Sequence, residues 1–93
     1  MQILTNTVGP TEMWAFSTTP IDMALRARLY DALGPYDARR LLARRFPSGS
    51  ATKTVEHRKQ NANHDAEQIS IVEQLANELL EDHYREQQEE FFA

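Results

Sequence analysis

A glycine-proline pair between two leucine-rich stretches constrains this chain more than any other feature. Leucines recur at four-residue spacing up to Leu33, which places them along one side of an α-helix. Gly34 can end such a helix in a left-handed cap, and Pro35 cannot extend that helix but suits the first turn of the next. The sequence therefore predicts one helix over residues 20–33 and a second over residues 35–46.

The first predicted helix begins at a capping signal. Thr19 suits the N-cap position and Pro20 the first helical position. Asp22 follows three residues after the cap, where its carboxylate can reach back to the amide of the cap and faces the positive end of the helix dipole. The residues expected on the buried side are Ile21, Ala24, Leu25, Leu29, Ala32 and Leu33.

The second predicted helix separates apolar from basic side chains. The residues expected to be buried are Ala38, Leu41, Leu42 and Phe46. The residues expected to share the opposite face are Arg39, Arg40 and Arg44. Arg45 falls on the apolar side, so either its stem packs while its head reaches solvent, or it forms an inward ion pair with Asp31 or Asp37.

The second half of the chain contains one weakly and one strongly patterned stretch. Residues 53–65 hold almost no large apolar side chain, so the helix that Ser50 caps is expected to be poorly anchored, and to be mobile or to lean on a partner. A last helix is predicted to begin at Asp65 and to extend towards Glu90. Its apolar face consists of Ile69, Val72, Leu75, Ala76, Leu79, Leu80 and His83. This face is too short for a coiled coil and predicts a helix that docks on its own core or on a partner.

Residues 1–19 are typical of extended chain. Apolar stretches on either side of the turn signal Gly9-Pro10 predict two short strands or a hairpin. Two strands alone are marginal in water, so their neighbours are expected in a larger sheet or in another copy. The predicted fold class is mainly α, with three to four helices preceded by a short β-strand or hairpin element. One domain is expected, divided into this extended segment, a basic helical segment at 20–60 and an acidic helix and tail at 61–93.

Charge is distributed unevenly along the chain, whose net charge is −4. Residues 20–59 carry a charge of +5, whereas residues 65–93 carry −8. This pattern predicts either intramolecular neutralisation or two separate docking surfaces. Ordinary solvated surface charge is the simplest interpretation of both halves.

The sequence contains no residue pattern that fits metal binding, catalysis by paired carboxylates or nucleotide binding. The three histidines, His57, His64 and His83, lack the spacing that puts two metal ligands on one side of a helix. The acidic side chains after residue 80 fit a solvated helix better than a pair of catalytic carboxylates. The chain has no phosphate-binding loop of the G-x-x-x-x-G-K-[ST] type, so Ser48-Gly49-Ser50 has nothing to hold a nucleotide. We expect no catalytic residue, no cofactor and no metal.

Compartment signals point to the cytoplasm. The chain has no cysteine, which excludes disulfides and fits a reducing environment. No apolar stretch approaches the ~20 residues that span a bilayer, and the N-terminus lacks the pattern of a secretory signal.

Two surfaces are candidates for partner binding. The arginine face formed by Arg39, Arg40 and Arg44 could contact phosphates of a nucleic acid, but the overall acidity and the lack of interleaved aromatics make this the weaker alternative. The other surface combines the apolar residues Leu75 and Leu79 of the last helix with Phe91 and Phe92 at the tail. Aromatic residues behind an acidic run can anchor in a partner's pocket, although a frayed helix end is the simpler interpretation.

A series of short motifs in fixed order resembles a known family. These motifs are Gly9-Pro10-Thr11-Glu12-Met13-Trp14-Ala15-Phe16-Ser17-Thr18-Thr19, then Ala24-Leu25-Arg26, Leu29-Tyr30, Leu33-Gly34-Pro35, Ala38-Arg39-Arg40-Leu41-Leu42-Ala43, Phe46-Pro47-Ser48-Gly49-Ser50-Ala51 and Glu56-His57-Arg58. Together they resemble the extreme C-terminal region of the conjugation and type IVB secretion ATPases of the TraU/IcmB type. The resemblance covers about residues 9–58.

The resemblance implies a helical appendage that follows an ATPase motor. The motor's nucleotide-binding loop and Mg²⁺ carboxylate have no counterpart in this chain, so the implied role is protein-protein contact within a secretion machine, without hydrolysis. The expected location is the cytoplasm, at the inner membrane where a secretion complex holds the protein. The alternatives are a free-standing helical adaptor or homodimer, and a nucleic-acid-binding module that uses the arginine face.

Overall fold

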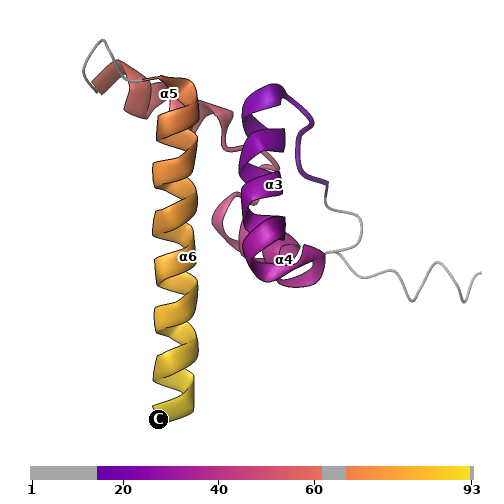
Figure 1. The fold of residues 1–93 in the computed structure, drawn as a ribbon. Coiled ribbons are helices and arrows are strands. Elements are labelled where there is room, and N and C mark those ends of the chain that lie inside the picture. The colour runs from indigo at the N-terminus through magenta and orange to yellow at the C-terminus, as the bar shows by residue number, and fades with distance from the viewer. Residues whose placement is uncertain (1–14, 62–66, 93) are drawn as a thin grey trace, which may run out of the picture.

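The computed structural model describes residues 15–61 and 67–92 of this chain. Within these ranges the helices are α3 (Pro20–Leu33), α4 (Pro35–Arg45), α5 (Thr52–Asn61) and α6 (Gln68–Phe92). Figure 1 shows the long α6 beside α3, with α5 near the first turns of α6 and α4 at the far end of α3. Helix α3 packs against both α4 and α6, and α5 packs against α6. The predicted mainly α fold is confirmed.

Helices α3 and α4 meet at the predicted glycine-proline boundary. Gly34 adopts φ 84° and ψ 163°, and its amide donates a 2.8 Å hydrogen bond to the Tyr30 carbonyl. The positive φ is accessible to glycine without steric cost, whereas the extended ψ differs from the left-handed helical cap that was expected. Pro35 begins α4 at once, so a single residue separates the two helices. Helix α4 ends at Arg45, one residue earlier than predicted.

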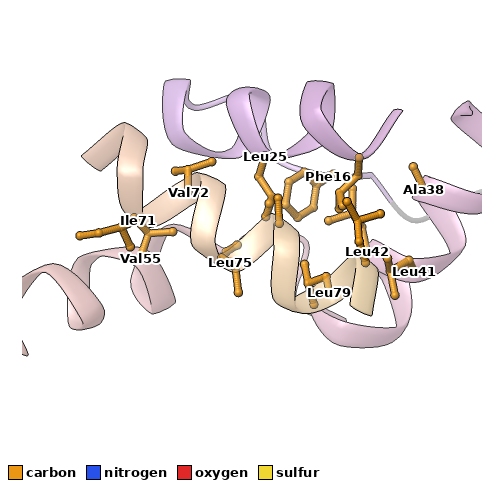
Figure 2. Close-up of a cluster of buried hydrophobic side chains, with 14 residues drawn as sticks. Phe16, Leu25, Ala38, Leu41, Leu42, Val55, Ile71, Val72, Leu75 and Leu79 are labelled. Carbon is orange, nitrogen blue, oxygen red and sulfur yellow. The ribbon is translucent and has the colours of Figure 1, made fainter. Parts of the chain in front are cut away.

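One hydrophobic core draws side chains from every described helix. Leu25 and Leu29 of α3 are fully buried, and Ala38, Leu41 and Leu42 of α4 are buried with them. Phe46, which was also expected to be buried, follows α4 and is partly buried against this core. Figure 2 shows Leu75 and Leu79 of α6 facing this cluster, on the side of the helix that the sequence pattern predicted. At about 25 cal/mol per Å² of buried apolar surface, this cluster is the main source of stability. Ala32 is exposed, which corrects its assignment to the buried side of α3.

The expected β element is not present in the described residues. Residues 15–18 have no strand conformation, and residues 1–14 lie outside the described ranges. Phe16 is buried in the helical core, with its ring 6.4 Å from the ring of Phe46. The Ser17 amide donates a 2.7 Å hydrogen bond to the Gly49 carbonyl. This part of the predicted strand material therefore packs as irregular chain against the helices.

Helix α5 is anchored more firmly than its sequence predicted. Val55 and Ala51 are fully buried, and Figure 2 shows Val55 beside Ile71 of α6. Ile71 is only 3% exposed, whereas Ile69, expected on the apolar face, is 53% exposed. The reason is that α5 covers a second side of the first turns of α6, so the buried face there is displaced from the stripe that continues along the rest of the helix. The structure thus corrects two predictions: α5 is not weakly anchored, and the buried face at the start of α6 includes Ile71 in place of Ile69.

Candidate interaction surfaces

A fully buried carboxylate joins the starts of two helices. Asp22 accepts a 2.8 Å hydrogen bond from the Ala51 amide through Oδ1. Its Oδ2 accepts hydrogen bonds from three hydroxyl groups, those of Thr19 at 2.9 Å, Ser50 at 2.7 Å and Thr52 at 2.9 Å. We call these five residues the Asp22 cluster. It places one negative charge at the positive ends of both α3 and α5.

The Asp22 cluster corrects the capping-box prediction. Asp22 contacts the Thr19 hydroxyl, whereas the Thr19 amide bonds to the Ser17 hydroxyl at 3.2 Å. Burial alone raises the pKa of Asp22, but the four hydrogen bonds that it accepts outweigh burial and hold its pKa below the usual 3.8. The carboxylate is therefore ionised and satisfied at neutral pH. This makes it a structural group that lacks the raised pKa of a general acid.

Ion pairs connect the basic helix α4 to the acidic helix α6. Arg44 binds the Glu86 carboxylate, and this hydrogen bond is the main cause of the lowered pKa of Glu86. Arg45 lies 3.2 Å from Asp82 and 3.6 Å from Glu86. The inward partner proposed for Arg45 was Asp31 or Asp37, and this is wrong because α6 supplies closer carboxylates. Of the two predictions from the charge pattern, intramolecular neutralisation is what these contacts show.

A bidentate ion pair joins α5 to α6. The two terminal nitrogens of Arg58 lie 2.6 Å and 3.0 Å from the carboxylate oxygens of Glu78. The hydrogen bond from Arg58 is the largest influence on Glu78 and lowers its pKa, although burial acts in the opposite direction. Parallel hydrogen bonds of this kind fix orientation as well as distance. The pair therefore links α5 to α6 through both oxygens of one carboxylate.

Separate replacement of Arg58 by Met and of Glu78 by Gln is expected to lower the free energy of unfolding by about 0.5 kcal/mol each. Both side chains are partly exposed, so solvent screens their attraction. A double-mutant cycle in urea would measure the coupling, and we expect it to decrease when the salt concentration is raised from about 0.05 M to 0.5 M. Lys59→Met on the same helix serves as the matched control. A coupling energy of zero between Arg58 and Glu78 at low salt would contradict the bidentate contact.

The predicted arginine face is exposed but lies next to carboxylates. Arg40 is positioned over the Tyr36 ring, 5.7 Å from its centroid, and Arg39 is half-buried. An open cleft of about 190 Å³ separates this part of α4 from α6. The cleft is lined by Asp37, Arg40, Leu41, Arg44, His83, Glu86, Gln87 and Glu90. Acidic side chains of α6 thus form the wall opposite the arginines.

The predicted apolar partner residues fall in two different environments. Leu75 and Leu79 are 3% and 5% exposed, so they belong to the chain's own core and do not form a free surface. Phe91 is 82% exposed near the end of α6, and the side chain of Phe92 lies outside the described structure. Tyr84 was not among the predicted partner residues, although it is 47% exposed and lies seven residues before Phe91. The signal was present, since seven residues are two helical turns and place both rings on one side.

No group of metal-ligating side chains is assembled within residues 15–61 and 67–92. The histidines do not contribute to one: His57 contacts Asn61 at 3.1 Å, and His83 stacks edge-on against Tyr84 at 5.8 Å. In the same ranges, no helix combines the length and apolar character needed to cross a membrane. Comparison with protein-family models, with curated proteins and with solved structures finds no match to this chain.

Proposed function

We propose that this chain is a non-catalytic helical interaction module that forms the C-terminal portion of a conjugation or type IVB secretion ATPase of the TraU/IcmB type. Its role is contact with other protein subunits of the secretion machinery. It acts on the cytoplasmic side, at the inner membrane where the complex assembles. No cofactor or metal is required for this role.

The Asp22 cluster is the observation that supports this proposal most strongly. Two motifs of the family resemblance, residues 17–19 and 46–51, are separated by more than twenty residues in the sequence. The Asp22 carboxylate binds the hydroxyl of Thr19 and the hydroxyl of Ser50, so both motifs contribute to one buried cluster. Motifs that pack together in one buried cluster are expected to occur in a fixed order along the chain. Their polar residues determine how α3 and α5 meet and leave no free nucleophile or base.

The arrangement of charges argues against the nucleic-acid alternative. Arg44 is bound by Glu86, and Glu89 and Glu90 lie around the same arginine. A phosphate backbone that approached this arginine would also meet these carboxylates, whose repulsion reduces the gain from counterion release. A protein partner with charges of both signs fits such a surface better.

Isothermal titration of this chain into the separately purified motor region of a TraU/IcmB-type ATPase tests the proposal. We expect a one-to-one complex with a Kd of about 50 µM or tighter, since a tethered module needs only modest intrinsic affinity. The chain alone should show no ATP turnover, because the sequence lacks a phosphate-binding loop. The motor region of an unrelated P-loop ATPase is the matched control. Equal binding to both motors, no binding to either, or turnover by the chain alone would contradict the proposed function.

A further inference from the structure

The C-terminal part of α6 contains no buried side chain. Leu80 is the last buried residue among the described side chains of this helix. We call residues 81–90, which follow it, the arm. Figure 1 shows this end of α6 running past α3 towards the C-terminus. A helical end without buried apolar side chains gains little from its own chain, because short helices alone are marginal in water.

A row of carboxylates lies on the inward side of the arm. Asp82, Glu86 and Glu90 recur at four-residue spacing, which places them on one side of the helix. At 100° per residue, this is the side through which Leu75 and Leu79 meet the core. Like charges at this spacing repel one another, and the helix dipole adds negative charge at the same end. The arm is therefore unfavourable as a helix unless basic groups of another element offset its charge.

Two arginines of α4 supply these basic groups across an open cleft. Helices α4 and α6 each pack against α3, whereas their backbones do not pack closely against each other. Arg44 binds Glu86, and Arg45 lies 3.2 Å from Asp82. All four side chains are partly exposed, and exposed ion pairs are weak. The arm is thus linked to α4 by contacts that carboxylates of another molecule can replace.

We propose that the arm is an autoinhibitory contact, which an acidic helix of a partner protein displaces when it binds Arg44 and Arg45. The arm itself shows the chemistry of that ligand: two carboxylates four residues apart on one side of a helix, paired with two neighbouring arginines. This spacing belongs to a helix, so it favours an acidic protein segment over the continuous charge of a nucleic acid. This inference rests on the proposed function and gives the chemistry of one partner.

The contact controls affinity through the fraction of molecules in which the arm is released. A partner that needs Arg44 and Arg45 binds only those molecules, so its apparent affinity is reduced by that fraction. Weakening the ion pairs of the arm should therefore strengthen binding of the partner. A surface that is simply basic does not behave in this way.

A synthetic helical peptide of about 18 residues, with glutamates at four-residue spacing on one side, provides the test. Its control peptide has the same composition with the glutamates distributed around the helix. Fluorescence anisotropy at about 50 mM salt is expected to give a Kd near 100 µM for the unmodified chain and near 20 µM for the Asp82→Asn, Glu86→Gln variant. Adding Arg44→Gln and Arg45→Gln to that variant should abolish saturation, which excludes Arg85, another basic neighbour of Asp82.

A second variant separates release of the arm from a change in net charge. Glu73→Gln with Glu81→Gln removes two exposed carboxylates of α6 that lie away from the inward side. Its net charge equals that of the Asp82→Asn, Glu86→Gln variant, yet it should bind the peptide as the unmodified chain does. Amide hydrogen exchange reports displacement directly: saturating peptide should speed exchange in residues 81–90 about fivefold and leave residues 71–80 unchanged.

Several results would overturn the inference. These are equal strengthening by the Glu73→Gln, Glu81→Gln variant, equal binding of both peptides, unchanged exchange of the arm at saturation, tighter binding of a DNA duplex than of the peptide, or a dimer that exchanges arms between two copies. If the chain binds the ATPase motor region but the peptide does not displace the arm, only the autoinhibitory inference fails. If the peptide displaces the arm and the motor region does not bind, only the proposed function fails.

Discussion

Replacing Asp22 with alanine is expected to lower the free energy of unfolding by about 3 kcal/mol. The side chain is fully buried and accepts four hydrogen bonds. Its removal leaves the Ala51 amide without its acceptor at the start of α5 and removes the negative charge from two helix N-termini. Folded small domains are stable by only about 5–15 kcal/mol, so this one substitution removes a large fraction of the total. Urea denaturation followed by circular dichroism at 222 nm measures the loss.

Asp22→Asn is the matched control for the same position. The amide keeps the shape and one acceptor oxygen but loses the charge, so we expect a loss about half that of the alanine variant. If both variants unfold at the same urea concentration as the unmodified chain, the Asp22 cluster does not hold α3 and α5 together.

The pH dependence of stability gives an independent check on the same group. Because the folded-state pKa of Asp22 lies below its usual 3.8, the unfolded chain binds the proton more readily. The contribution of Asp22 is therefore fully present above about pH 4 and is lost as the pH falls through the folded-state pKa. The Asp22→Asn variant should show a smaller loss over that acid range than the unmodified chain. An identical acid dependence would mean that other carboxylates account for it.

Replacing Leu75 with alanine is expected to cost about 3 kcal/mol, the second large effect. Leu75 is 3% exposed and faces the shared core, so the substitution removes buried methyl groups and leaves a cavity between α6 and the other helices. Thermal and urea denaturation should both show the loss. Phe91→Ala removes a larger side chain that is 82% exposed, and we expect it to change stability by less than about 0.5 kcal/mol. The opposite ranking would mean that α6 does not pack through its leucine face.

Leu75→Ala and Phe91→Ala also separate the two roles that were predicted for the last helix, packing on the chain's own core and docking on a partner. The apolar pattern of residues 69–83 was consistent with docking on the chain's own core or on a partner. The structure assigns Leu75 and Leu79 to the core, whereas Tyr84 and Phe91 are exposed near the C-terminal end of α6. Stability and partner binding should therefore respond to different residues of the same helix. Variants at positions 84 and 91 can test binding without loss of the fold.

Electrostatic links join the basic and the acidic parts of this chain. The arginine pairs with Asp82, Glu86 and Glu78 connect α4 and α5 to α6. Exposed pairs of this kind contribute little individually to stability. They also leave part of the acidic charge of α6 uncompensated at its C-terminal end.

The sequence alone determined where α3 begins and ends and where α4 begins, because local signals are sufficient for this. Pro20 and Pro35 fit only the first turn of a helix, and Gly34 supplies a positive φ at the boundary. The leucine spacing likewise identified the buried sides of these helices, since a helix places every third or fourth residue on the same side.

Only the tertiary structure decided which elements these faces meet. Asp22 carries a local capping signal, and its contact with Ala51 depends on how α3 and α5 approach each other in space. Arg45 has acidic residues nearby in the sequence, yet it pairs with Asp82, 37 residues away, because α6 lies closer in space. Ile71 is buried in place of Ile69 because α5 covers a second side of α6. Periodicity fixes the direction of a side chain relative to its own helix axis, whereas the identity of its neighbour follows from the packing of several helices together.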